Sequence, residues 1–298
     1  MLVVEIAEAE AVGRGECVPY PRYGETVSGV VNQIATIVPE LEKGMGRADL
    51  PSVLPAGAAR NAVDCALWDL QAKQSGTPVW RRAGLSEPHP LTTAVTLSLA
   101  EPDEMAAAAR KQDGCPWLKV KLGRDGALER LRAVHEAQPA ARIIVDANEA
   151  WTAPTLEDFA AKAATLGVAL IEQPLPAAED DALIDMNLAV PLCADESCHG
   201  TDTLERLRRR YQAVNIKLDK TGGLSEALEL LKAARSLGFE IMIGCMVGTS
   251  LAMAPAILLA ASADFVDLDG PVHLAADRAH PIIYDRGRLN PAGLDLWG

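Results

Sequence analysis

The sequence is short of positive charge. Its 298 residues include 28 lysines and arginines against 41 aspartates and glutamates, which gives a formal net charge of −13. Proteins bind nucleic acids and anionic membranes through basic surfaces. We therefore expect neither as a partner, although an acidic surplus alone identifies no ligand.

Cysteine motifs are also missing. The six cysteines form no CxxC pair and follow no regular spacing. A chain of this length buries enough apolar surface to fold without disulfide bonds. We expect reduced, mostly buried thiols at Cys17, Cys65, Cys115, Cys193, Cys198 and Cys245.

No long hydrophobic run is present. The longest apolar stretch, residues 251–263, is too short to span a bilayer. The first residues lack the basic segment and the apolar run of a secretory signal. We therefore expect the protein in the cytoplasm.

What the chain does have is length and hydrophobic content. With 49% hydrophobic residues, it has room for one barrel domain and a modest second domain. From about Leu91 onward, short apolar runs alternate with amphipathic stretches, the pattern of β/α units around a parallel sheet. We expect strands at 91–99, 117–123, 142–148, 169–174, 191–196, 213–218, 240–245 and 265–269, and helices near 101–112, 126–138, 155–166, 178–187, 202–210, 223–237 and 249–262.

This alternation predicts an α/β fold. Eight parallel strands close naturally into a barrel, and barrel active sites lie at the C-terminal ends of the strands. We expect a (β/α)7β barrel, a modified TIM barrel, over residues 91–270.

The rest of the chain reads differently. Residues 1–90 predict a strand at 2–8, a Gly/Pro-rich turn from Gly13 to Tyr20, and helices around 26–43 and 57–75. We expect an α+β capping domain there, joined by the C-terminal segment 271–298, with the stretch 18–26 near the mouth of the barrel.

Charged side chains gather at the ends of the predicted strands. Lys119/Lys121, Asp146/Asn148, Lys217/Asp219 and Asp267/Asp269 are pairs separated by two residues. Strand side chains alternate between faces, so both members of a pair point the same way. Because helices cover the outside of a closed barrel, charged side chains of its strands must point into the barrel.

Three carboxylates predict a metal site. Asp146, Glu172 and Asp195 follow three successive strands and would converge on one point. Crowded carboxylates repel one another unless a cation lies between them, and all-oxygen ligation suits Mg²⁺ or Mn²⁺ better than zinc. Any one of them is more often a helix cap, but three at matching strand ends favour one metal ion per chain.

Three lysines complete the predicted site. Lys119 and Lys121 share one face of the second strand, and Lys217 ends the sixth strand across the barrel. A free lysine, with a pKa of about 10.4, is a poor base at neutral pH, and a neighbouring ammonium lowers that value. We expect Lys119 to do this for Lys121. A carbon acid held between Lys121 and Lys217 could then lose its α-proton on one side and regain it on the other.

These residues resemble the enolase superfamily and, within it, the muconate-lactonizing subgroup. The resemblance covers nearly the whole chain, from Gly57-Ala58-Ala59-Arg60-Asn61-Ala62 and Ala66-Leu67-Trp68-Asp69 to the last strand. It implies metal ligation by Asp146, Glu172 and Asp195, acid/base roles for Lys121 and Lys217, enolate stabilisation by Lys119 and the metal, and orienting roles for Asn148 and Glu196.

The motif Asp267-Leu268-Asp269 resembles that of dipeptide epimerases, where it holds the substrate's ammonium group. The first strand, which contains Thr96, is also similar to these epimerases, and we include Thr96 among the substrate-binding residues. The resemblance thus implies Mg²⁺-dependent epimerisation of dipeptides, with L-Ala-D/L-Glu as the expected substrate. It also implies a further hairpin with a mobile loop ahead of the strand at 2–8, which we expect this chain to lack.

Other reactions stay open. An N-acylamino-acid racemase, an o-succinylbenzoate synthase or a cycloisomerase would use the same fold, and a non-catalytic relative could bind a metal or a small molecule. Asp267 and Asp269 distinguish a dipeptide epimerase from the racemase, the synthase and the cycloisomerase, because the substrates of these three enzymes carry no ammonium group to bind. His199 is interpreted as a loop residue, and assembly into a homo-oligomer is left open.

Overall fold

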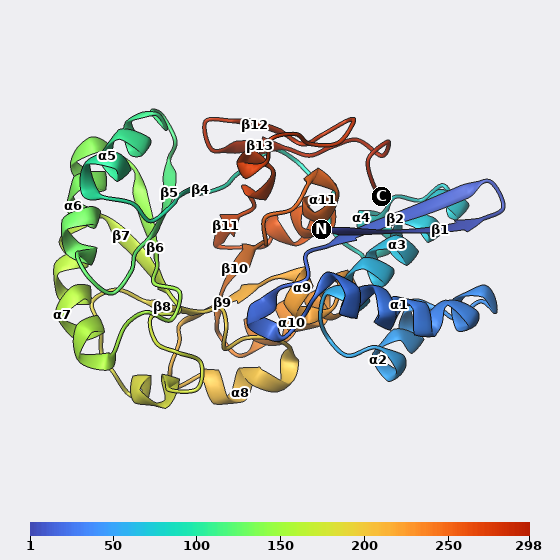
Figure 1. Ribbon diagram of the computed structural model, residues 1–298, viewed down its shortest axis with the longest axis horizontal. Coiled ribbons are helices and arrows are strands. Elements are labelled where there is room, and N and C mark those ends of the chain that lie inside the picture. The colour runs from blue at the N-terminus through green and yellow to red at the C-terminus, as the bar shows by residue number, and fades with distance from the viewer.

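The computed structural model describes residues 1–298. Eight parallel strands form its central sheet, each bonded to the next in chain order (Figure 1). They are β4 (Val95–Leu97), β5 (Trp117–Lys121), β6 (Arg142–Asp146), β7 (Val168–Glu172), β8 (Leu192–Ala194), β9 (Ala213–Ile216), β10 (Glu240–Gly244) and β11 (Phe265–Asp267).

Hydrogen bonds join the first and last strands of this sheet. The Ala94 amide donates to the Val266 carbonyl at 2.8 Å, and the Leu268 amide donates to Thr93 Oγ1 at 2.9 Å. The sheet therefore curls into a nearly closed barrel. This confirms the predicted fold class.

The barrel interior has two layers, as the alternation of strand side chains requires. Ile144, Leu170 and Cys193 point inward and are fully buried in the lower layer. Two residues further along the same strands or just beyond them come Asp146, Glu172 and Asp195, also buried. An apolar plug thus supports a layer of charged groups at the C-terminal ends of the strands.

Helices cover the outside of the barrel. Figure 1 shows α5, α6 and α7 on the side away from the N-terminal region. The helices of the barrel are α5 (Pro102–Arg110), α6 (Ala127–Ala137), α7 (Ala153–Ala163), α8 (Leu204–Leu207), α9 (Leu218–Thr221), α10 (Leu224–Ser236) and α11 (Ser250–Ala260). Short 3-10 turns are η3 (Ala164–Leu166), η4 (Asp180–Leu183), η5 (Thr201–Thr203) and η6 (Gly270–His273).

Two predicted helices are wrong or shortened. The helix expected at 178–187 is only the turn η4, because the buried Asp180 carboxylate is held by Ser197 Oγ at 2.7 Å and by Arg210 at 2.6 Å. These contacts with distant segments override the local helical pattern. The helix expected at 202–210 is reduced to η5 and the single turn α8.

The predicted strand at 91–99 is divided. Its first part, β3 (Leu91–Thr92), pairs with β13 (Arg288–Asn290), which in turn pairs with β12 (Ile283–Asp285) in a separate antiparallel sheet. Only β4 belongs to the barrel. The chain passes from one sheet to the other at Thr93, whose side chain bonds to the segment after β11.

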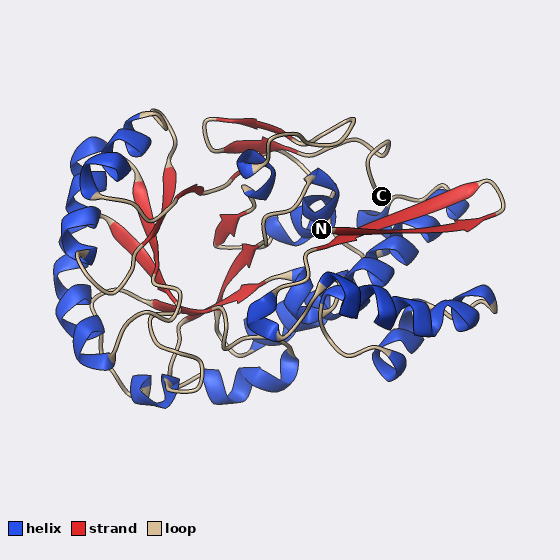
Figure 2. Ribbon diagram, viewed as in Figure 1, coloured by secondary structure: helices blue, strands red, loops and turns tan.

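The N-terminal region lies beside the barrel, and Figure 2 shows its long two-stranded hairpin extending away from it. The hairpin pairs β1 (Leu2–Glu8) with β2 (Ala11–Cys17). The helices of this region are α1 (Val27–Glu42), α2 (Leu50–Val53), α3 (Ala58–Ser75) and α4 (Val79–Arg82), with the 3-10 turns η1 (Pro21–Tyr23) and η2 (Arg47–Asp49).

The predicted turn at 13–20 is wrong over its first half, because β2 continues to Cys17. Its glycines serve close packing. A Cβ atom on Gly15 would lie 2.0 Å from the carbonyl oxygen of Ala62, and one on Gly13 would lie 2.1 Å from that of Ala66. Only residues without a side chain let β2 approach α3 this closely.

The C-terminal segment ends against α3. Trp297 Nε1 donates to the Cys65 carbonyl at 3.1 Å, and the Gly298 amide donates to Asp69 Oδ1 at 2.8 Å.

All six cysteines are free, and only Cys245 is not fully buried. None of the helices combines the length and the apolar character needed to cross a bilayer. The division into domains at residues 91 and 271 remains a prediction.

The packing of β2 on α3 generates a stability test. Replacing Gly15 by Ala should lower the free energy of unfolding by at least about 1–3 kcal/mol, because the new methyl group overlaps the α3 backbone. Urea unfolding followed by circular dichroism measures the change. The matched control, Gly293→Ala, adds a methyl group into open space and should change stability by less than about 0.5 kcal/mol. Equal midpoints for the two variants would contradict the packing argument.

Candidate active site

A cavity of about 220 Å³ opens at the C-terminal ends of the barrel strands. All the predicted site residues line it except Glu172, which lies beneath and is fully buried. The cavity brings together Lys119, Lys121, Lys217, Asp146, Asp195, Asp267, Asp269, Thr96, Asn148 and Glu196.

Strand register explains this convergence. Lys121 of β5 pairs with Asp146 of β6, and Asp146 pairs with Glu172 of β7. In a parallel sheet such neighbours point to the same face. Asp195 follows β8 directly, and Lys217 follows β9. The three carboxylates therefore lie on the strands between the two lysines.

Lys119 lies at the centre of the charged layer. Its ammonium nitrogen is 3.1 Å from Asp146 Oδ2, 2.7 Å from Glu172 Oε2 and 2.7 Å from Asp267 Oδ2. Burial alone would lower the pKa of Lys119, but these carboxylates raise it well above its usual value. Lys119 is therefore a fixed positive charge. Its expected effect on Lys121 stays a prediction.

Asp195 is held by two lysines. Lys217 Nζ lies 2.7 Å from Oδ2, and Lys220 Nζ lies 2.6 Å from Oδ1. Burial would raise the pKa of Asp195, but the two ammonium groups hold it well below its usual range. Burial would likewise lower the pKa of Lys217, and Asp195 raises it well above its usual value.

Lys121 is the most accessible of the site lysines, with 40% of its side chain exposed. Its ammonium donates to Asn148 Oδ1 at 2.9 Å and lies 3.4 Å from Asp146 Oδ2. Asn148 also donates its backbone amide to Asp146 Oδ1 and has a positive φ of 44°. This strained turn after β6 holds Lys121 and Asp146 together, which fits the orienting role predicted for Asn148.

The carboxylates suit a hard divalent cation. No three groups are close enough to form a ready-made metal site, because ammonium groups lie between them. Burial and the nearby Asp146 raise the pKa of Glu172 to about 8, and burial with Asp195 raises that of Glu196 to about 7. Glu196 Oε2 is buried without a hydrogen-bond partner, and the only partner of Glu172 Oε2 is the Lys119 ammonium at 2.7 Å. A cation among these oxygens would relieve the crowding of the carboxylates and give Glu196 Oε2 a partner.

Sequence reasoning missed three residues that hold these carboxylates in place. Asn215 Nδ2 donates to Glu172 Oε1 at 2.7 Å, and its place two residues before Lys217 on β9 was the available signal. Gln173 Oε1 accepts the Asp195 amide at 2.9 Å. Lys220, fully buried, also donates to the backbone carbonyls of Asp195 and Asn215.

The opposite wall of the cavity is acidic. Asp267 Oδ2 bonds to Lys119, whereas Asp267 Oδ1 is buried and has no partner. Asp269 Oδ2 accepts the Thr96 amide at 2.6 Å and lies 3.0 Å from His273 Nε2. Thr96 thus positions Asp269 through its backbone. His273 is a further residue that sequence reasoning missed.

The expectation that Asp219 points inward with Lys217 is wrong. The strand ends at Ile216, and Asp219 lies on α9. Its Oδ1 accepts the Val18 amide at 3.0 Å and Asn61 Nδ2 at 2.9 Å, and burial raises its pKa to about 7. Asp219 therefore fastens the N-terminal region to the barrel.

The stretch 18–26 lies at the cavity mouth, as expected. Tyr20 and Tyr23 line the cavity, and Arg22 forms a two-pronged ion pair with Glu149, with both contacts at 2.7 Å. The Tyr23 ring packs edge-on against His199, with centroids 4.9 Å apart. His199 also bonds to the Glu196 carbonyl, consistent with a loop residue.

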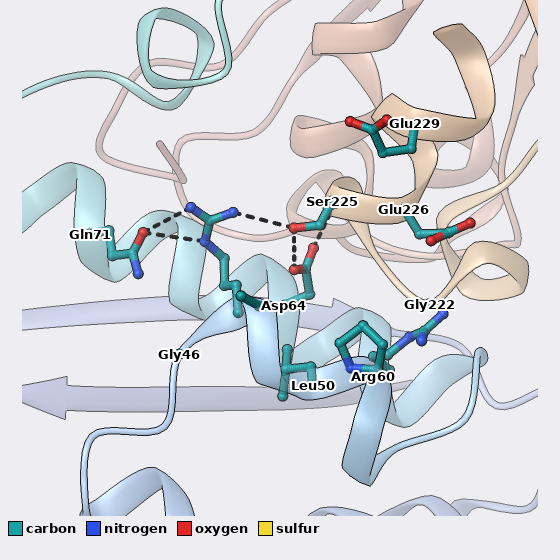
Figure 3. A pocket seen from close by; sticks show the side chains of 12 residues that line it. Gly46, Leu50, Arg60, Asp64, Gln71, Gly222, Ser225, Glu226 and Glu229 are labelled. Carbon is teal, nitrogen blue, oxygen red and sulfur yellow. Dashed lines mark hydrogen bonds between the residues drawn. The ribbon is translucent and has the colours of Figure 1, made fainter. Parts of the chain in front are cut away.

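A larger hollow of about 480 Å³ lies between α3 and α10 (Figure 3). Several of its polar groups bond to one another. Asp64 accepts from Ser225 Oγ at 2.6 Å, and Arg47 donates to Gln71 and Ser225. These bonds join the N-terminal region to the barrel, whereas the groups suited to proton transfer lie in the smaller cavity.

Two family models match the chain. "Mandelate racemase / muconate lactonizing enzyme, N-terminal domain" matches residues 1–84, and "Enolase C-terminal domain-like" matches residues 103–291. Among similar curated proteins, the L-Ala-D/L-Glu epimerase of Escherichia coli is 48% identical, covering 97% of this chain and 91% of the relative. The N-acetyl-D-glutamate racemase of a Pseudoalteromonas species is also 48% identical, covering 100% and 95%.

Solved structures similar to this chain indicate the same family. An enolase family member from Agrobacterium tumefaciens, with bound sodium and L-Ala-L-Glu, superposes with a TM-score of 0.97 at 50% identity, covering 99% of this chain and 91% of that one. A dipeptide epimerase from Enterococcus faecalis, complexed with Mg and L-Leu-L-Tyr, gives 0.89 at 28% identity, covering 98% and 90%. The resemblance noted from the motifs is confirmed, and the chain belongs to the mandelate racemase/muconate lactonizing enzyme family of the enolase superfamily.

Proposed function

We propose that this protein is a Mg²⁺-dependent dipeptide epimerase that inverts an α-carbon by 1,1-proton transfer, with L-Ala-D/L-Glu or a related dipeptide as substrate. The observation that carries the proposal is the placement of Lys121 and Lys217 on either side of one cavity, with Asp146 and Asp195 between them. A substrate carboxylate near the acidic strands would place its α-carbon between the two lysines.

The lysines supply the proton transfer. One neutral amine removes the α-proton, and the ammonium on the opposite face returns a proton, so that the configuration inverts. In the reverse direction the two exchange roles. Lys119, fixed by three carboxylates, cannot easily give up its proton. It contributes a permanent charge that stabilises the developing enolate.

The three carboxylates Asp146, Glu172 and Asp195 would hold the metal ion. The solved Enterococcus faecalis epimerase is complexed with Mg, and Mg²⁺ would stabilise negative charge on the substrate carboxylate when bound. Asn215 and Lys220 keep Glu172 and Asp195 in place.

The acidic wall supports a substrate with an ammonium group. Asp267 Oδ1 is a buried oxygen without a partner, next to Asp269. The amino group of a dipeptide would satisfy it by a charge-assisted hydrogen bond. The similar proteins that act on or hold L-Ala-Glu favour the same class.

Racemisation of N-acylamino acids is the second candidate, because an N-acetyl-D-glutamate racemase is as similar to this chain as the Escherichia coli epimerase. N-Acetylglutamate and Ala-Glu share an acylated glutamate, and the dipeptide differs by the ammonium and a methyl carbon on the acyl group. Asp267 and Asp269 favour the dipeptide, since an acyl group offers them no charge.

Glu172→Gln tests the metal assignment. The amide is a weaker ligand and cannot balance the ion's charge, so Mg²⁺ affinity measured by calorimetry should fall by at least about tenfold. Glu129→Gln, at an exposed position on α6, should leave it unchanged. Undiminished affinity in Glu172→Gln would show that the ion binds elsewhere.

Lys217→Ala tests the two-base mechanism. Epimerisation should fall by about 10²–10⁴-fold, the contribution of a positioned base or acid. Exchange of the α-proton should persist for one configuration in D₂O, because Lys121 still reaches its own face. Mass spectrometry and chiral chromatography follow both reactions. A variant that epimerises at the full rate would refute the proposal.

The third test concerns Asp267 and Asp269. L-Ala-L-Glu should have a kcat/KM at least about 100-fold above that of its N-acetylated form, because buried carboxylates left without a cation cost several kcal/mol. The double variant Asp267→Asn, Asp269→Asn should lose this preference, chiefly through the free dipeptide. If the unmodified protein turned over both equally, the racemase alternative would be favoured.

A further inference from the structure

His273 stands at the rim of the acidic wall, and nothing in the proposed mechanism uses it. It ends the turn η6, four residues after Asp269, and it lines the cavity. Its Nε2 lies 3.0 Å from Asp269 Oδ2, and 31% of its side chain is exposed. The imidazole therefore reaches the same carboxylate oxygen that the substrate's ammonium would approach.

The net charge of the acidic wall depends on whether His273 is protonated. Asp267 is paired with Lys119, and Asp269 has only the Thr96 amide and His273 as partners in the structure. A protonated His273 neutralises Asp269. A neutral His273 leaves one uncompensated negative charge on the wall, which an ammonium group could balance.

The surroundings of His273 favour the charged form. The hydrogen bond to Asp269 raises the pKa of His273 against the opposing effect of burial, and Asp267 adds to the rise, while Lys121 lowers it. The helix α11 packs against η6 and carries no titratable side chain. Protonation of His273 is therefore governed mainly by Asp269.

We propose that His273 selects the substrate class by competing with the substrate's ammonium for Asp269. The neutral imidazole admits free dipeptides, and the imidazolium favours N-acylated amino acids, which need no counter-charge. This inference rests on the proposed function and extends it.

The test measures kcat/KM for L-Ala-L-Glu and for N-acetyl-L-glutamate on the Mg²⁺-saturated full chain. The ratio of the two should rise by about fivefold or more between pH ~5.5 and ~7.5, a coupling of ordinary size between two sites. Over this range the dipeptide's amino group, with a pKa of about 7.7–8.0, stays mostly charged. Its own titration would lower the ratio, so it cannot imitate the expected rise.

Two variants isolate the histidine. His273→Gln removes the titratable charge and should give a high ratio that no longer rises with pH. His273→Arg carries a permanent charge and should give a low ratio at every pH. His89→Gln, at an exposed position, should behave as the unmodified protein. A ratio independent of pH in the unmodified protein, or the same rise in His273→Gln, would overturn the inference.

Binding provides a second measurement that needs no folded variant at the site. By linkage, an ammonium that competes for Asp269 must lower the pKa of His273, read by NMR from its Cε1 proton, whereas N-acetyl-L-glutamate should not lower it. Absence of a decrease with the dipeptide would also overturn the inference. Failure of the proposed function would look different, with no α-proton exchange in D₂O for either substrate, and the NMR titration would still decide the role of His273.

Discussion

The compensation of buried charge is the constraint on which the site depends. Lys119 is surrounded by Asp146, Glu172 and Asp267, and Asp195 is surrounded by Lys217 and Lys220. None of these groups could be buried alone, because an isolated ion loses several kcal/mol of hydration. Parallel strands in a common register bring the opposite charges to one level, so the barrel is what makes this layer tolerable.

The two layers of the barrel interior serve different purposes, stability in the lower layer and chemistry in the upper layer. The lower layer is apolar, with residues such as Ile144 and Leu170, and stabilises the fold by burial. The upper layer gains little stability from its charges. Its oxygens are instead left able to accept new partners, since Glu196 Oε2 and Asp267 Oδ1 have no hydrogen bond.

Much of the site could be predicted because its signal is local. An i, i+2 pair at a strand end fixes the direction of both side chains, and this placed Lys119, Lys121 and Asp146 correctly in the cavity. The failures arise where distant segments decide. Gly15 suggests a turn until α3 is seen against it, and Asp219 suggests an inward position until α9 and the Val18 amide are known.

Residues that support the site were harder to find than those that perform the chemistry. Lys220 and His273 lie on short turns after strands, α9 and η6, where side-chain direction follows no simple period. Gln173 is buried with a positive φ of 33°. The division of the chain into domains and the roles of the individual site residues remain predictions.

The ion pair between Arg22 and Glu149 has an evolutionary consequence. The pair anchors a short turn to the loop after β6. This turn contains Tyr20 and Tyr23, so a segment outside the barrel strands forms this part of the cavity wall. Changes in the sequence of that turn can reshape the cavity mouth while the lysines and carboxylates on β5 to β9 stay untouched. The range of substrates and the reaction chemistry can therefore change independently, so related enzymes can use one set of proton-transfer residues on different substrates.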